Sequence, residues 1–288
     1  MIKKFLVTGA NGQLGKDLIL QLKDRGYDTV GIDVDNVDIT DRQAVFDKIE
    51  SERPFAVIHC AAWTAVDAAE EEKNKKKVYS INVNGTKNIA DACKKHRCRM
   101  TYISTDYVFD GNGTTPWEPD CKDYAPLNYY GQTKLLGEEA VSQTLKDYFI
   151  IRIAWVFGRY GNNFVRTMLK LGENHDTLRV VNDQIGTPTY TYDLARLIID
   201  INESNKFGYY HATNEGGYIS WYDFAKEIFK TAKMSTKVIP VTTEEYGLSK
   251  ARRPFNSRLD KSKLEKNGFT PLPSWQDALK RYIDEMKE

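Results

Sequence analysis

Short apolar runs alternate with amphipathic stretches over the first half of the 288-residue chain. The runs that we expect to form buried strands are residues 4–8, 27–33, 55–62, 99–105 and 148–155. The intervening stretches with helical spacing of apolar side chains are residues 13–26, 41–52, 83–96 and 129–145. Strands that alternate with helices predict an α/β fold, a Rossmann-type doubly wound parallel sheet.

The pattern loosens beyond residue 157, where polar, irregular segments are mixed with helices. We therefore predict a dinucleotide-binding domain in residues 1–157, with a return segment near 182–205. A smaller, irregular α/β domain in residues 158–288 is expected to bind the substrate. Ligands of such folds bind beyond the carboxyl ends of the parallel strands, so the site is expected there.

Charge and cysteine content exclude several classes of partner. The 41 Lys and Arg residues almost balance the 40 Asp and Glu residues, which gives no field for nucleic acid or a membrane surface. The apolar run that opens the chain is too short for a signal peptide or a membrane span. Four cysteines without a CxxC motif favour the cytoplasm, and scattered histidines predict no metal site. The mixed-charge segment 70–77 is expected to be a solvated face.

The first predicted strand ends in the sequence Gly-Ala-Asn-Gly-Gln-Leu-Gly, residues 9–15, which has glycines at every third position. Glycines between a strand and a helix let the backbone turn tightly and approach a pyrophosphate. The second strand ends at Asp33, where a carboxylate can bind ribose hydroxyls, although an ordinary turn carboxylate would look the same.

A second motif, "NYYGQTK", places Tyr130 four residues before Lys134 and Tyr129 five residues before it. Residues four apart share a helix face, so Tyr130 is the candidate acid, with Asn128 as the helix N-cap. A lysine ammonium nearby, helped by the positive charge of a nicotinamide after its oxidation, is expected to lower the pKa of the phenol. Thr105, at the end of the fourth strand, is expected to hold the substrate carbonyl oxygen.

These motifs, with "NVNGTKN", resemble the extended short-chain dehydrogenase/reductases. Within them, the chain is similar over nearly its whole length to the dTDP-4-dehydrorhamnose reductase family, on the segments "TGANGQLG", "CAAWTAVDAAE", "STDYVFDG", "YGQTKLLGE", "GNNFVRTML", "NDQIGTPT" and "RRPFNSRL". Trp63 and Ile153 depart from the residues expected there. The resemblance implies reduction of the C4 ketone of a dTDP-linked 4-keto-6-deoxy sugar with NADPH or NADH. A homodimer is left open.

The resemblance also implies site residues. The catalytic residues would be Thr105, Tyr130 and Lys134. The coenzyme, besides Tyr130, Lys134 and Asp33, would contact Gly9, Asn11, Gly12, Gln13, Leu14, Gly15, Asp38, Ile39, Ala61, Ala62, Thr64 and Asn82. The sugar nucleotide, besides Thr105, would contact Val66, Tyr107, Trp155, Asn163 and Arg253. Trp155 could instead belong to the core, and Arg253 could be a solvated cation.

Several alternatives share these motifs. A nucleotide-sugar 4,6-dehydratase needs further acid–base groups beside the threonine, and the sequence Thr105-Asp106-Tyr107 lacks the glutamate found in that class. An epimerase uses the same three residues and stays open, as does a ketoreductase of other stereochemistry. A non-catalytic binding subunit, like the regulatory partner of methionine adenosyltransferase, is disfavoured by the intact reactive residues.

Overall fold

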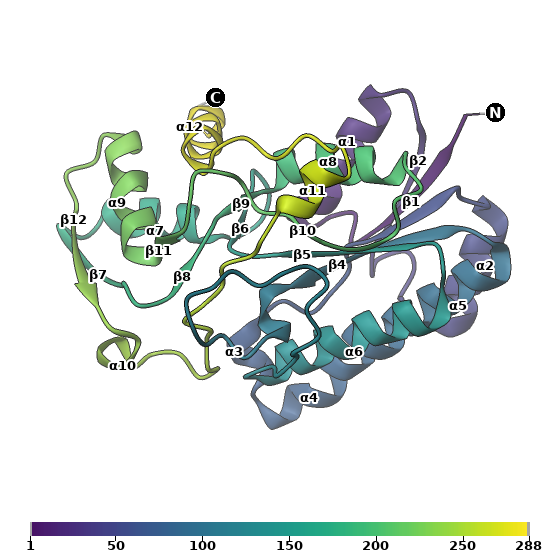
Figure 1. Ribbon diagram of the computed structural model, residues 1–288, viewed down its shortest axis with the longest axis horizontal. Helices are drawn as coiled ribbons and strands as arrows, with labels where there is room; N and C mark the ends of the chain where they lie inside the picture. The colour runs from purple at the N-terminus through teal and green to yellow at the C-terminus, as the bar shows by residue number, and fades with distance from the viewer. Residues whose placement is uncertain (1, 287–288) are drawn as a thin grey trace.

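The computed structural model describes residues 2–286, and its centre is a sheet of six parallel strands (Figure 1). The first strand, β1, has side chains buried on both faces, which explains its continuous apolar sequence. The strands, in their order across the sheet, are β10 (Gly208–His211), β5 (Tyr148–Ile153), β4 (Arg99–Thr105), β3 (Ala56–His59), β1 (Lys4–Thr8) and β2 (Asp28–Ile32).

Helices cover both faces of this sheet, as the doubly wound prediction required. One face carries α1 (Gln13–Asp24), α8 (Thr191–Asn202) and α11 (Ser262–Lys266), whose buried apolar side chains join those of β1, β3 and β5 in one core. The other face carries α2 (Arg42–Glu52), α5 (Thr86–His96) and α6 (Tyr129–Thr144). Two short helices, α3 (Val66–Ala69) and α4 (Glu72–Tyr79), and the π-helix η1 (Ser80–Gly85) lead into α5.

The second half of the chain forms a separate core beside the sheet. Three two-stranded pairs occur there: β7 (Thr177–Val181) with β12 (Lys237–Val241), β8 (Ile185–Gly186) with β11 (Ile219–Ser220), and β6 (Val156–Phe157) with β9 (Thr189–Tyr190). The helices of this part are α7 (Phe164–Gly172), α9 (Trp221–Ala232), α10 (Thr243–Tyr246) and α12 (Trp275–Glu285). Aromatic residues such as Phe157, Tyr190, Phe224 and Tyr282 fill the core.

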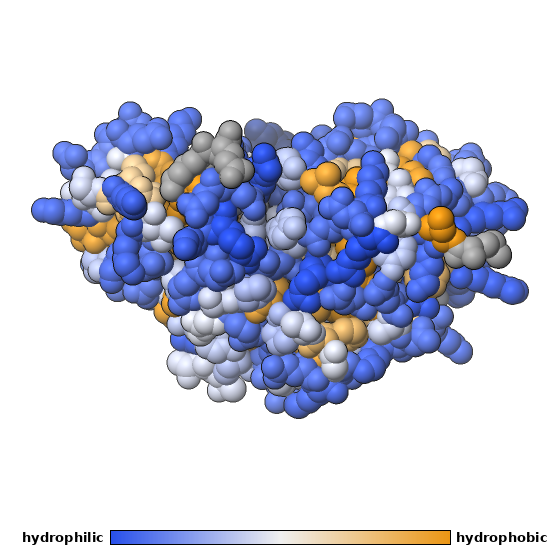
Figure 2. All heavy atoms as spheres, turned by 90° about the horizontal axis from the view of Figure 1, so that it is seen from above, coloured by the Kyte–Doolittle hydropathy of each residue, from blue (hydrophilic) through white to orange (hydrophobic). Residues whose placement is uncertain are grey.

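The predicted fold class is confirmed, and all five predicted strands form within their expected ranges. The chain segment that rejoins the central sheet extends beyond the predicted residues 182–205, because the sixth strand, β10, begins only at Gly208. The surface seen in Figure 2 is mostly hydrophilic, with separate small apolar patches. Within residues 2–286, no helix combines the length and the apolar character that crossing a membrane demands.

Candidate active site

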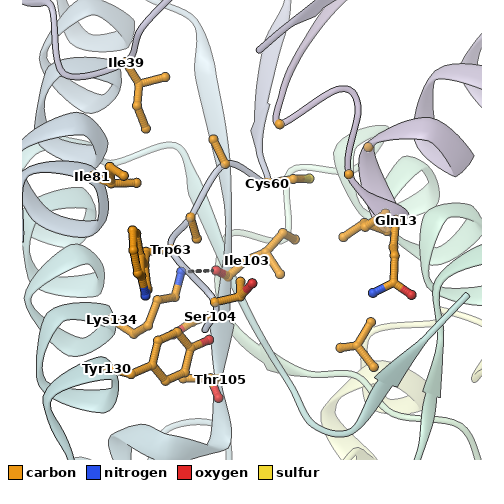
Figure 3. Close-up of a pocket in the computed structure, with 18 of the residues that line it drawn as sticks. Gln13, Ile39, Cys60, Trp63, Ile81, Ile103, Ser104, Thr105, Tyr130 and Lys134 are labelled. Atoms are coloured by element: carbon orange, nitrogen blue, oxygen red, sulfur yellow. Dashed lines mark hydrogen bonds between the residues drawn. The ribbon is translucent and has the colours of Figure 1, made fainter. Parts of the chain in front are cut away.

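A cavity of about 1260 Å³ lies at the carboxyl ends of β1 to β5, where the fold predicts it. Pockets for one small ligand usually measure about 300–1,000 Å³, so this cavity has room for more than one ligand. Figure 3 shows its wall, from Ile39 past Trp63 to Tyr130 and Thr105. Every predicted site residue lines the cavity except Asn82, Asn163 and Arg253.

The glycine loop forms a cradle at one end of the cavity. Gly9 has φ +64°, and a Cβ there would lie 2.8 Å from the backbone nitrogen of Ala61. A Cβ at Gly15 would overlap the carbonyl oxygen of Gly9. Helix α1 starts immediately after Gly12, and no side chain caps its first turn. The free N–H groups of that turn make an anion site, so the loop fits the pyrophosphate of a dinucleotide.

Two carboxylates line the cavity beyond the ends of the glycine loop and β2. Asp33 Oδ2 accepts a hydrogen bond from the backbone N–H of Asn11 at 2.9 Å, which ties the two loops together. Asp38 Oδ1 accepts one from the N–H of Thr40 at 2.8 Å. An ionised carboxylate has about four lone-pair sites, so each can still accept a hydroxyl of a bound ribose. Binding of ribose by Asp33 stays a prediction.

Helix α6 presents Tyr130 and Lys134 to the cavity, and both side chains are buried. Asn128 caps the helix as predicted, since its Oδ1 accepts from the N–H of Gly131 at 2.8 Å. Lys134 Nζ donates to the carbonyl oxygen of Ile103 at 2.7 Å (Figure 3). Tyr129 points elsewhere, because its hydroxyl donates to the carbonyl oxygen of Lys75 at 3.3 Å.

Burial dominates the electrostatics of this pair in the protein without coenzyme. Burial raises the pKa of Tyr130 above that of a free phenol, and the charge of Asp106 adds to the rise. Burial also lowers the pKa of Lys134 to about 7, although the charge of Glu138 acts in the opposite direction. In the protein without coenzyme the phenol is therefore a neutral proton donor, and the lowering of its pKa beside an oxidised nicotinamide stays a prediction.

Ser104, Thr105 and Asp106 place four side-chain oxygens at and just after the end of β4. The hydroxyl of Thr105 donates to Asp106 Oδ1 at 3.0 Å and accepts from the N–H of Tyr107 at 3.3 Å. Within the described residues, Ser104 Oγ and Asp106 Oδ2 are buried without a hydrogen-bond partner. Burial raises the pKa of Asp106 to about 6. Burying an oxygen without a hydrogen-bond partner costs free energy. The position of Ser104 Oγ and Asp106 Oδ2 in the cavity wall therefore fits a polar ligand that would donate to them.

Trp155 lines the part of the cavity nearest the second half of the chain. Its backbone has φ +51°, an unusual conformation for a large side chain. The indole stacks on that of Trp221, the first residue of α9, with ring centroids 3.7 Å apart and planes 16° apart. One face of Trp155 is thus covered by Trp221. Sequence reasoning missed Trp221, because an aromatic residue at the start of a helix gives no separate signal.

The three predicted residues outside the cavity wall have internal partners. The amide of Asn82 accepts from the N–H of Trp63 at 2.8 Å and donates to Thr133, so it fixes the loop after β3. The amide of Asn163 caps α7 and donates to the carbonyl oxygen of Gly158 at 2.9 Å. Both amides therefore have partners within the fold, and the ligand contacts expected of Asn82 and Asn163 stay predictions.

Arg253 lies just behind Tyr107, which does line the cavity. Its Nη2 donates to Asp67 Oδ2 at 2.8 Å, and its Nη1 lies 3.5 Å from the Tyr107 hydroxyl. The side chain keeps 29% of its surface exposed, so a ligand could still reach it. A donor fork beside a cavity suits a phosphate group.

Three lysines of α4 also line the cavity, namely Lys73, Lys76 and Lys77. The sequence predicted a solvated face for this segment, because positive and negative charges are mixed in it. All three side chains are exposed, so the prediction of a solvated face is confirmed for them, and they stand at the rim of the cavity. Their charges give the cavity a positive rim, which favours anionic ligands.

The family of the RmlD substrate binding domain matches residues 3–288. Spore coat polysaccharide biosynthesis protein SpsK of Bacillus subtilis is 43% identical, over 98% of this chain and 97% of the relative. A dTDP-4-dehydrorhamnose reductase of Aggregatibacter actinomycetemcomitans is 42% identical, over 96% and 97%. The crystal structure of a dTDP-4-dehydrorhamnose reductase from Bacillus anthracis in complex with NADP is 42% identical, with a TM-score of 0.94, and covers 99% of this chain and 100% of that one.

Proposed function

The chain belongs to the family of the RmlD substrate binding domain, and from this membership we propose that it is a reductase that uses NADPH or NADH. Its proposed substrate is dTDP-4-dehydro-6-deoxy-L-mannose, and its product dTDP-L-rhamnose. The observation that carries the proposal is the position of Tyr130 and Lys134. Both lie on one face of α6, buried in the same cavity wall as Thr105 and the glycine cradle.

The coenzyme is proposed to bind from the glycine loop towards Lys134. The first turn of α1 would hold its pyrophosphate, Asp33 would accept from the adenosine ribose, and Asp38 and Ile39 would lie at the adenine. Ala61, Ala62 and Thr64 would form the opposite wall. When it is bound, the reduced nicotinamide supplies the hydride that reduces the C4 carbonyl carbon.

Tyr130 is proposed to donate the proton that the C4 oxygen takes up. A neutral phenol can act as this general acid, and its raised pKa keeps the proton in place until the oxygen becomes basic. The ammonium of Lys134 would then stabilise the phenolate that Tyr130 becomes. Thr105 would hydrogen-bond the same oxygen, and its hydroxyl would have to rotate away from Asp106 to do so.

The nucleotide end of the substrate is proposed to lie near Val66, Tyr107 and Trp155. These residues line the cavity on the side of the second half of the chain. Arg253 would reach the diphosphate past Tyr107. Remote contacts of this kind hold a small reacting ketone in a fixed position, which is a large part of catalysis.

The experiment that tests this function combines the purified protein with a dTDP-4-keto-6-deoxy sugar and reduced coenzyme. Loss of absorbance at 340 nm reports the coenzyme, and NMR of the product assigns the configuration at C4. An epimerase would change the sugar without net loss of NADPH or NADH. A non-catalytic binding subunit would bind one or both ligands and change neither.

A further inference from the structure

The ammonium of Lys134 lies in an unusual place for a charge. The side chain is 3% exposed, and one polar acceptor, the carbonyl oxygen of Ile103, lies 2.7 Å from Nζ. An ammonium has three N–H donors, so a single carbonyl cannot compensate the water that it loses on burial. Something else in its surroundings must support the charge.

The charged and titratable groups around Lys134 supply only part of that support. Glu138, one turn further along α6, is held by Arg152 through hydrogen bonds of 2.8 and 2.7 Å. Burial raises the pKa of Cys60 to about 12, so that group is a neutral thiol. Burial lowers the pKa of His59 to about 3, so that ring is neutral as well. Tyr130 is a neutral phenol.

A further neighbour is the ring of Tyr102, which stands on β4 directly before Ile103. Lys134 Nζ lies 4.0 Å from the centroid of this ring. A cation within about 6 Å of the face of an aromatic ring is attracted by its quadrupole, and most strongly where water is excluded. Tyr102 is 1% exposed, so this pair meets that condition.

Helix α6 is shaped to admit the ring. A Cβ at Gly137, three residues after Lys134, would overlap the hydroxyl of Tyr102. With glycine there, that hydroxyl donates to the carbonyl oxygen of Lys134 at 3.4 Å. The ring also stacks on His59, with centroids 5.7 Å apart and planes 23° apart. The ring is therefore held between β3 and α6, and its position relative to Nζ is fixed.

We propose that Tyr102 is a positioning residue of the reductase reaction, whose ring face keeps the Lys134 ammonium charged and aimed at the cavity. The inference rests on the proposed function. Tyr102 does not line the cavity, so it acts through Lys134 and not on a ligand. The pKa of Lys134, about 7, indicates how small the margin for the charged form is.

The test replaces Tyr102 with phenylalanine and then with phenylalanines that carry one, two and three ring fluorines. These side chains keep the size of the ring while they progressively weaken the negative potential on its face. Tyr102→Phe should keep the pH profile of kcat/KM almost unchanged, because the ring remains. With three fluorines on the ring, the fall of kcat/KM at alkaline pH should begin about one pH unit lower. At pH values above that point, kcat/KM should then be about tenfold lower than in Tyr102→Phe.

If Tyr102 only fills space beside Lys134, fluorination should not shift the pH profile. If all the fluorinated variants retain the pH profile of Tyr102→Phe, or lose activity equally at every pH, the proposal is wrong. Circular dichroism confirms that each variant is folded. The pH dependence of Lys134 acetylation by acetic anhydride, measured by peptide mass spectrometry, gives a readout that needs neither coenzyme nor sugar. If this titration shifts among the fluorinated variants while the protein turns over no substrate, the proposed reductase function is wrong. The effect of the Tyr102 ring on the charge of Lys134 would still be supported.

Discussion

Tyr129 and Tyr130 are neighbours in the chain, yet they face different parts of the molecule. Tyr130 lines the cavity, whereas the hydroxyl of Tyr129 donates to the carbonyl oxygen of Lys75, 3.3 Å away on α4. One residue along a helix turns the side chain by about 100°. The four-residue spacing to Lys134 therefore selects Tyr130 for the cavity face of α6.

Tyr130→Phe should lower kcat by two to four orders of magnitude, because general acid catalysis typically contributes about that much. Tyr129→Phe is the matched control, since it removes the same hydroxyl group from the adjacent residue and should keep most of the activity. Steady-state kinetics of the two variants check this. Retained activity in Tyr130→Phe with lost activity in Tyr129→Phe would contradict the helical-face argument.

Asp33 bears on the choice of coenzyme. The segment 31–38 contains carboxylates and no arginine to receive a 2′-phosphate, and Asp33 lines the cavity. NADH should therefore be used at least about as well as NADPH, as judged by kcat/KM for each coenzyme. A hundredfold preference for NADPH would remove Asp33 from the ribose role.

Arg253→Ala should raise the KM for the sugar nucleotide by about ten- to a hundredfold, because a charge-assisted bond to phosphate contributes about 1.5–3 kcal/mol. The KM for the coenzyme should not change. Arg253→Lys should recover only part of the loss, since a point charge cannot replace a donor fork. Equal weakening of both ligands would assign Arg253 a structural role, through its ion pair with Asp67.

Sequence patterns predicted the fold well where their physical cause is local. The strands β1, β3, β4 and β5 are mostly buried and rich in apolar residues because helices cover both faces of the sheet. β10 escaped prediction, since its four residues, Gly208 to His211, are too few to show a period.

The site residues also differ in how well the sequence identifies them. Glycines and the Tyr130–Lys134 pair are fixed by backbone geometry, which sequence spacing reveals. The amides of Asn82 and Asn163 could not be assigned in this way, because an amide that binds a ligand and one that caps a helix look alike in sequence. Arg253 reaches Asp67 across 186 positions of the chain, and spacing does not reveal such contacts.

The buried ion pair between Glu138 and Arg152 gives a prediction about stability. The two side chains are 1% and 0% exposed, and their atoms approach to 2.7 Å. Glu138→Gln should lower the free energy of unfolding by about 3–5 kcal/mol, because the charge of Arg152 would remain buried without its counter-ion. Glu139→Gln, on the exposed side of α6, is the control and should change it by less than about 0.5 kcal/mol. Urea denaturation measures both, and equal values for the two variants would contradict the account.

The central claim is that the protein uses NADPH or NADH to reduce the C4 ketone of a dTDP-linked 4-keto-6-deoxy sugar. The most direct measurement follows coenzyme oxidation by the purified protein with that substrate and identifies the product by NMR. We predict one equivalent of NADPH or NADH oxidised for each sugar reduced, with dTDP-L-rhamnose as the product. A sugar that is changed without net coenzyme oxidation, or coenzyme and sugar that are bound and left unchanged, would contradict it.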